Sequence, residues 1–375
     1  MKKLFKIFTL VLLVVSFVFA MAACTNNNGE SANDKGILCT KYGNDTFFTV
    51  YDYVDDGVTS SLDIDAAVKA KYGAQAEVGK IKSGAFQDNE SLSEIIVPNS
   101  VTEIAEGAFR GIKKLKKLTI PFVGKTIESD AFIGESVSDT KSIDKERTIY
   151  HLFGKDSYEY GSSISFNNGG ESETYYIPAM LETITVSNSN QYSIPAYAFN
   201  GLSIVGKIVL SGNIDAIGEF AFANCRALNS INVPSTVKTI YNNAFEGCEN
   251  LKDGGLVFDA NSTLVEIRDK AFIKTALTTL ELPSSVETIG NYCFQQSALE
   301  SIILSANLKT IGAKAFYGCE NLVKVDNTAM IFTEGTSIGV AAFENCAKLD
   351  ADDVACKLDL TKFAFVHSTA FNGTK

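Results

Sequence analysis

One pattern of apolar residues recurs along most of this sequence, and the recurrence limits the possible folds more than any other feature. The copy at 217–240 reads IGEFAFANCRALNSINVPSTVKTI. Ile217, Ala221 and Phe222 are spaced to lie on one side of a short helical turn. The later run L-x-x-I-x-V ends in the alternation of a half-buried strand, and Pro234 ends that strand because proline has no N–H to donate. Each copy therefore predicts one coil, made of a turn and a strand.

In every copy a phenylalanine follows an apolar residue by five positions, and the step between successive phenylalanines is 22 or 23 residues for most pairs and 27 or 28 for three. The apolar side chains of one copy are too few to offset the conformational entropy lost on ordering it, so the copies must stack. The sequence predicts a repeat solenoid of about eleven coils, mainly β with short helical or 3-10 turns. The phenylalanines expected to form the repeat core are Phe86, Phe109, Phe132, Phe199, Phe222, Phe245, Phe272, Phe294, Phe316, Phe343 and Phe371.

The first twenty-three residues differ from the rest of the chain. Three lysines precede an uncharged run at 7–20, which is typical of a secretory signal peptide. The tetrapeptide Met21-Ala22-Ala23-Cys24 resembles a bacterial lipobox, in which Cys24 becomes the lipidated N-terminus; the alternative is ordinary signal peptidase cleavage. Residues 24–35 are polar and suit a flexible tether. We expect export and lipid anchoring to the outer face of a bacterial membrane.

Residues 36–80 do not show the repeat and are predicted to form an N-terminal cap, followed by the solenoid at 81–375. Five aspartates in the cap raise the hypothesis of a calcium site. Their spacing lacks a known calcium-loop pattern, so a solvated acidic turn is favoured. These residues are Asp52, Asp55, Asp56, Asp63 and Asp65.

The repeat is interrupted between Phe132 and Phe199, which are 67 residues apart. The interruption predicts an insert at about 136–176, rich in tyrosine, serine, glycine and asparagine, a mixture also found in binding loops. The alternative is that Tyr150, Leu152 and Phe153 pack back over the solenoid, with the remainder disordered or a β-hairpin. The candidate ligand-binding residues of the insert are Tyr150, Tyr158, Tyr160, Tyr175 and Tyr176.

The cysteines and histidines favour structural roles over chemistry. Four cysteines follow a repeat phenylalanine by three residues, and Cys293 replaces the repeat alanine, so they are predicted to be small buried side chains. A disulfide between Cys225 and Cys248 is the alternative. There is no C-x-x-C pair or Cys/His cluster, and His151 and His367 lie in no catalytic motif. The sequence therefore predicts no metal site, no cofactor and no enzyme activity.

The segments A-F-x-x-C, L-x-x-I-x-V-P and S-x-V-x-x-I resemble the BspA type of leucine-rich repeat, also called the Treponema pallidum type, over residues 81 to 371. The insert sequence His151-Leu152-Phe153-Gly154 resembles a cassette that interrupts some members. The resemblance implies a solenoid with strands along its length, found on bacterial and protist surfaces. In some members it implies adhesion to host matrix proteins or to other bacteria. It supplies no catalytic residues.

Charge and repeat together suggest the class of partner. The net charge of −11 becomes −14 when Lys2, Lys3 and Lys6 are removed with the leader, which disfavours nucleic acid and anionic lipid surfaces as ligands. We expect a surface lipoprotein that binds a protein or another cell-surface ligand, with its membrane contact through the N-terminal lipid. The alternatives are a glycan-capturing lipoprotein, which the absence of tryptophan disfavours, and a structural envelope protein.

Overall fold

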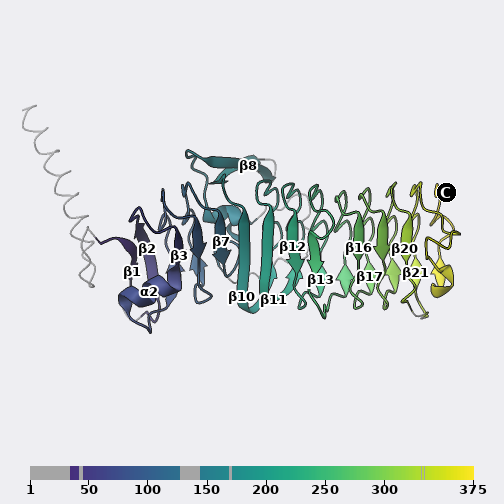
Figure 1. Ribbon diagram of the computed structural model, residues 1–375, viewed down its shortest axis with the longest axis horizontal. Helices are drawn as coiled ribbons and strands as arrows, with labels where there is room; N and C mark the ends of the chain where they lie inside the picture. Colours follow the sequence, from purple (N-terminus) through teal and green to yellow (C-terminus); the bar gives the residue numbers. More distant parts are fainter. Residues whose placement is uncertain (1–33, 42–44, 127–143, 169–170, 331, 333) are drawn as a thin grey trace, which may run out of the picture.

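The computed structural model confirms a repeat solenoid: about eleven coils lie side by side along one long axis (Figure 1). The structure describes residues 34–41, 45–126, 144–168, 171–330, 332 and 334–375. The predicted signal peptide, Cys24, nearly all of the tether and Phe132 lie outside the described residues. None of the helices in these ranges combines the length and the hydropathy that a membrane span requires.

Residues 36–80, predicted as a cap, carry the one α-helix among the described residues. Strands β1 (Gly36–Thr40) and β2 (Phe48–Val54) are antiparallel, and β2 then pairs in parallel with β4 (Val78–Ile81). Between them lie β3 (Ser61–Asp63) and α2 (Ile64–Tyr72). Asp63 caps α2 by accepting the N–H of Ala66, and Gly73 ends the helix with a φ of 106°. The helix buries Ile64 and Val68 against the solenoid core.

Two parallel ladders run along the solenoid. The strands of the I-x-V segments are β3, β5 (Glu94–Ile96), β7 (Lys117–Ile120), the first part of β10 (Thr183–Ile194), the first part of β11 (Lys207–Ile217), β12 (Ser230–Val233), β14 (Leu256–Phe258), β16 (Thr279–Glu281), β18 (Ser301–Ile303) and β20 (Lys324–Asp326). The short strands at the first isoleucine of each copy are β6 (Glu103–Ile104), β13 (Thr239–Ile240), β15 (Glu266–Ile267), β17 (Thr288–Ile289), β19 (Thr310–Ile311), β21 (Ser337–Ile338) and β22 (Phe365–Val366). Strands β10 and β11 are long enough to belong to both ladders.

The segment from isoleucine to phenylalanine differs from the helical turn that its spacing predicts. Its first residue ends a strand, as Ile217 ends β11, and the phenylalanine N–H bonds to the next coil, as Phe222 N does to Ala244 O at 2.8 Å. Residues two positions before and two after the phenylalanine have positive φ in the coils from Phe199 to Phe343. These left-handed residues turn the chain so that its N–H groups point along the solenoid axis.

The phenylalanines form the predicted file. From Phe199 to Phe371 the ring centroids of successive coils lie 4.9 to 5.4 Å apart, with interplanar angles of at most 14°. Phe86 stacks on Phe109 at 5.3 Å. All the described repeat phenylalanines are fully buried apart from Phe371 at the last coil. The stack therefore supplies the continuous core that single copies lack.

The cysteines are buried and free, as their repeat positions predict. The Cys225 thiol donates to Phe199 O at 3.1 Å, and the Cys248 thiol donates to Phe222 O at 3.2 Å. Cys319 and Cys346 repeat the contact one coil apart. The alternative of a disulfide between Cys225 and Cys248 is wrong, because both side chains are free thiols that bond to carbonyls of the preceding coil.

Candidate binding surface

The first part of the insert is built into the solenoid core. It contains two short 3-10 helices, η1 (Lys145–Arg147) and η2 (Ile149–Leu152). Phe109 N donates to Leu152 O at 3.0 Å, the bond that other coils form with the residue before the next phenylalanine. The Phe153 ring is fully buried with its centroid 6.4 Å from that of Phe109. Leu152 and Phe153 thus occupy the coil position next to Phe109.

This coil position was missed by the repeat pattern for a specific reason. Ile149 precedes Phe153 by four residues instead of five, and Leu152 stands where most copies have alanine. Tyr150, Leu152 and Phe153 are all buried, as the alternative of packing against the solenoid expects, but Leu152 and Phe153 lie within the coil stack and not over it. A search that allowed one deletion within the isoleucine-to-phenylalanine segment would have found the position.

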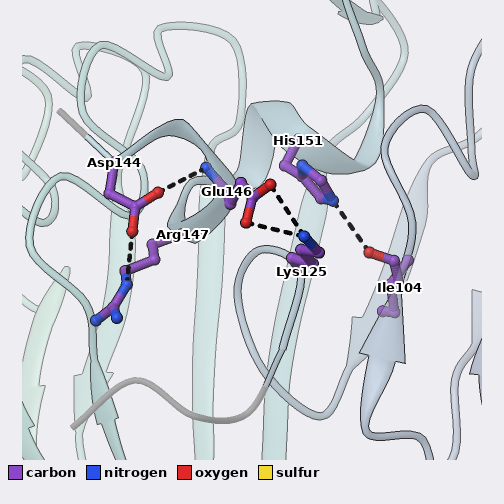
Figure 2. A network of polar contacts seen from close by, with 6 residues as sticks. All are labelled: Ile104, Lys125, Asp144, Glu146, Arg147 and His151. Atoms are coloured by element: carbon purple, nitrogen blue, oxygen red, sulfur yellow. Dashed lines mark hydrogen bonds and ion pairs between the residues drawn. The ribbon is translucent and has the colours of Figure 1, made fainter. Parts of the chain in front are cut away.

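A polar network fixes η1 and η2 against the preceding coil (Figure 2). Lys125 contacts Glu146 at 3.0 Å, and Arg147 Nε donates to Asp144 at 2.9 Å. His151 lies within 3.1 Å of Ile104 O through Nε2, and its own carbonyl accepts the N–H of Gly107 at 2.8 Å. Burial lowers the pKa of His151 below 6.5, so the neutral imidazole is favoured in the folded protein.

The second part of the insert is an antiparallel hairpin of β8 (Gly161–Asn168) and β9 (Glu171–Pro178), which Figure 1 draws above β10 and β11 on the outside of the solenoid. Glu173 anchors the hairpin near the end at which β8 leads into β9, where it is paired with Phe166. Its carboxylate pairs with Lys145 and with Lys155 at 3.5 Å, and accepts the Tyr175 hydroxyl at 3.1 Å. Although burial raises the pKa of Glu173, the hydrogen bonds from Lys145 and Tyr175 hold it below 4.5.

The five candidate tyrosines divide into two groups. Tyr150 and Tyr175 are buried with ring centroids 5.5 Å apart, and the Tyr150 hydroxyl donates to Asn200 O on the following coil. Tyr158 and Tyr176 are partly exposed, and Tyr160 is 60% exposed. Burial removes the first pair from any surface that a ligand could contact. Whether the second group binds a ligand stays a prediction.

The exposed part of the insert presents an apolar patch among acidic groups. Ala179 N donates to Tyr160 O at 3.0 Å, which brings the exposed Met180, the next residue after Ala179, near Tyr160 in space. Asp156 and Glu159 are exposed beside it, and Asp156 pairs with Arg110 of the solenoid. We define the hairpin surface as Tyr158, Tyr160, Tyr176 and Met180.

The cap aspartates serve the local backbone. Asp55 accepts the N–H groups of Gly57 at 2.8 Å and of Glu90 at 3.0 Å, which joins the acidic turn to the first coils. Asp56 accepts the N–H of Thr59 at 2.7 Å. Among the described residues no group of three or more histidine, cysteine or acidic side chains could hold a metal ion. The preferred interpretation as an acidic turn agrees with these contacts for Asp55 and Asp56, whereas Asp52 lies in β2, Asp63 caps α2 and Asp65 lies within α2.

Comparison with known proteins gives one family. The family model described as the BspA type leucine rich repeat region matches this chain with six copies of the repeat, at residues 79–171, 171–257 and 256–372. No curated protein matches the chain significantly.

Several solved structures are also similar. A leucine-rich repeat protein from Bacteroides ovatus is 18% identical, with a TM-score of 0.36 over 92% of this chain and 81% of that chain. A leucine rich cell surface protein from Faecalibacterium prausnitzii is 16% identical, with a TM-score of 0.34 over 90% of this chain and 94% of that chain. The Treponema pallidum leucine rich repeat protein is 17% identical, with a TM-score of 0.27 over 92% of this chain and 99% of that chain.

Proposed function

The chain belongs to the BspA type of leucine-rich repeat proteins, and from this premise we propose that it is a bacterial cell-surface protein that binds a protein partner through its hairpin surface. The family membership supports a binding scaffold without catalysis. The charged, apolar and small-residue segments of the leader support export, and the Cys24 lipobox supports a lipid anchor. A lipid-anchored solenoid holds its sides free for contact with molecules outside the cell.

The observation that carries the proposal is that the insert is anchored at both of its parts while side chains at the open end of the hairpin stay exposed. Tyr150 and Phe153 fix the start of the insert in the core, while Glu173 ties β9 to Lys145 and Lys155. Tyr160 remains 60% exposed on this support. Tyrosine supplies a large contact area with few rotatable bonds, so a side chain held in this way loses little entropy on binding.

The test uses the exported chain without its leader and measures binding to intact cells and to purified extracellular matrix proteins. Tyr160→Ser and Tyr176→Ser should weaken the binding at least tenfold, because apolar contact area is lost from the hairpin surface. Tyr317→Ser is the matched control: this partly exposed tyrosine contacts Lys314 on a solenoid turn and lies outside the insert.

Substitution is a sharper test than deletion. Removing residues 136–176 would also remove Phe153 and Tyr175 from the core, so a loss of binding could reflect unfolding. Equal binding by wild type and Tyr160→Ser would contradict the proposed role of the hairpin surface. Binding only to a glycan array, with no protein ligand, would favour the glycan-capturing alternative.

A further inference from the structure

The I-x-V ladder has one break among the described strands, between β14 and β16. From β3 to β14 and from β16 to β20 each strand pairs with the strand of the next coil. β14 pairs only with β12, and β16 pairs only with β18. In the other ladder of the same coils β15 and β17 remain paired. The two coils therefore stay together on one side while their strands separate on the other.

The coil that precedes the break has extra residues before β14. Ile231 of β12 lies three residues after Leu228, whereas its partner Leu256 of β14 lies five residues after Leu251. The longer connection contains Asp253 and Gly254, and Gly254 has a φ of 72°. β14 nevertheless pairs in register with β12, with Ile231 opposite Leu256, so the ladder opens only on the side that faces β16.

A groove with a volume of about 720 Å³ fills the space beside the break. The side chains of Leu256 and Leu280 are buried beneath it, while Val257 is 49% exposed. The groove continues over Ser301 and Ile303 of β18. Its lining thus comes from three successive strands of one face.

Backbone groups of both edges point into this groove. Gly255 O and Asp259 N bond to β12, so alternation along the strand turns the N–H and C=O of Phe258 to the opposite side. Leu282 N bonds to Ile303 O of β18 at 3.0 Å, which turns the backbone of Glu281 away from β18 and toward the groove. A polypeptide strand carries the donors and acceptors that such edges can pair with.

The groove is also acidic. Asp259 and Glu281 are exposed and line it, and no lysine or arginine is among its lining residues. Asp259 accepts only a long 3.4 Å contact from Asn232, and no ion pair to either carboxylate occurs in the part of the chain that the structure describes. A ligand with basic side chains would complement the two carboxylates.

We propose that the groove between β14 and β16 binds an extended, basic segment of another polypeptide by β-strand addition. The backbone groups of Phe258 and Glu281 supply the pairing, and Asp259 and Glu281 select basic side chains. This surface is separate from the hairpin surface and extends the proposed function to a second contact with a protein.

The probe is a synthetic peptide of about six residues, the usual length of a strand, that alternates lysine with valine. We expect it to bind the leaderless chain and to shift the amide resonances of Phe258 and Glu281. The same peptide with glutamate in place of lysine should bind at least tenfold more weakly. A version with N-methyl groups on alternate residues should lose affinity to a similar extent, because it cannot donate to both edges.

Glu281→Gln and Asp259→Asn should each weaken binding of the lysine peptide at least threefold and reduce its salt dependence. Asp352→Asn, which removes an exposed carboxylate from a distant coil, is the matched control. Three outcomes overturn the proposal: no binding of the peptide, binding that ignores N-methylation, or equal effects of the groove and control variants. In the first case the acidic side chains serve to protect strand edges from aggregation.

Discussion

The carboxylate of Asp253 takes the place of a main-chain carbonyl as the hydrogen-bond acceptor for the N–H of Thr278. This carboxylate accepts the N–H groups of Thr278 at 3.0 Å and Thr279 at 2.8 Å, and it also accepts the Thr278 hydroxyl. In other coils the two N–H groups that begin a strand donate to a backbone oxygen of the preceding coil, as Glu300 and Ser301 do to Thr278 O. One side chain therefore continues the hydrogen bonding at the point where the ladder opens.

Substitution of Asp253 should destabilise the chain at neutral pH. We expect Asp253→Ala to lower the free energy of unfolding by about 1 kcal/mol, the usual effect of losing a side-chain cap on free N–H groups, and Asp253→Asn to lower it less. The hydrogen bond from Thr278 lowers the pKa of Asp253 below 3.8. The stabilisation is therefore present above pH 3.8 and is lost as the pH falls through the lower folded value. Urea titrations of wild type and Asp253→Ala at pH 7 and at a pH below 3.8 test this. Equal stability of the two proteins at pH 7 would contradict it.

The phenylalanine file should dominate stability. Phe272→Ala removes a fully buried ring that stacks on Phe245 and Phe294, so we expect a loss of about 3 to 5 kcal/mol. Phe365→Ala is the control, since Phe365 is 57% exposed and should change the free energy of unfolding by less than about 0.5 kcal/mol. Thermal or urea unfolding measures the change in the free energy of unfolding for each variant. Similar losses in both would show that the file is not the main core.

The left-handed residues of each turn should respond to glycine. Lys270 has a φ of 58°, and Lys270→Gly should stabilise the chain by about 0.5 to 1 kcal/mol because glycine adopts this conformation without strain. Gly318 has a φ of 68°, and a Cβ there would contact only Gln296 at 3.5 Å. Gly318→Ala should therefore destabilise by about 1 kcal/mol through backbone strain alone. The denaturant midpoints of both variants test these predictions. Midpoints that shift in the same direction for Lys270→Gly and Gly318→Ala would refute them.

Protonation of His151 should loosen the insert. Because burial lowers its folded pKa below 6.5, stability is present above pH 6.5 and is lost as the pH falls through the folded value. Unfolding measured at pH 7.5 and 5.5 should show a larger loss for wild type than for His151→Gln. His367→Gln is the control, since His367 is only partly buried and contacts Thr369. No difference between wild type and His151→Gln would count against this role.

The buried thiols should be unreactive toward thiol reagents in the folded chain. Burial raises the pKa of Cys248 from 9.0 to about 12, and it raises that of Cys225 as well. Their contribution to stability is complete below pH 9.0 and is lost as the pH rises through the folded pKa, which for Cys248 is about 12. A thiol reagent at pH 8 should modify both only at the rate of unfolding, which mass spectrometry after partial labelling measures. Rapid labelling of Cys225 or Cys248 without unfolding would contradict their burial.

The sequence by itself determined the solenoid and its core. The constant distance from Ile217 to Phe222, repeated in later copies, makes each coil place its ring beside the next, and Phe222 lies 5.2 Å from Phe245 as that regularity requires. The same regularity identified Cys225 as a buried thiol. Such features depend on spacing within one copy, so a linear pattern contains them.

Only the tertiary structure decided which insert side chains face water and where the ladder opens. Tyr150 and Tyr160 were both candidate binding residues, yet Tyr150 is buried with its hydroxyl bonded to Asn200 on another coil, while Tyr160 is exposed. Likewise, β14 and β16 are unpaired although β15 and β17 of the same coils remain paired, and no local pattern predicts this. Burial and strand pairing depend on contacts between residues far apart in the chain, and the local pattern does not contain those contacts.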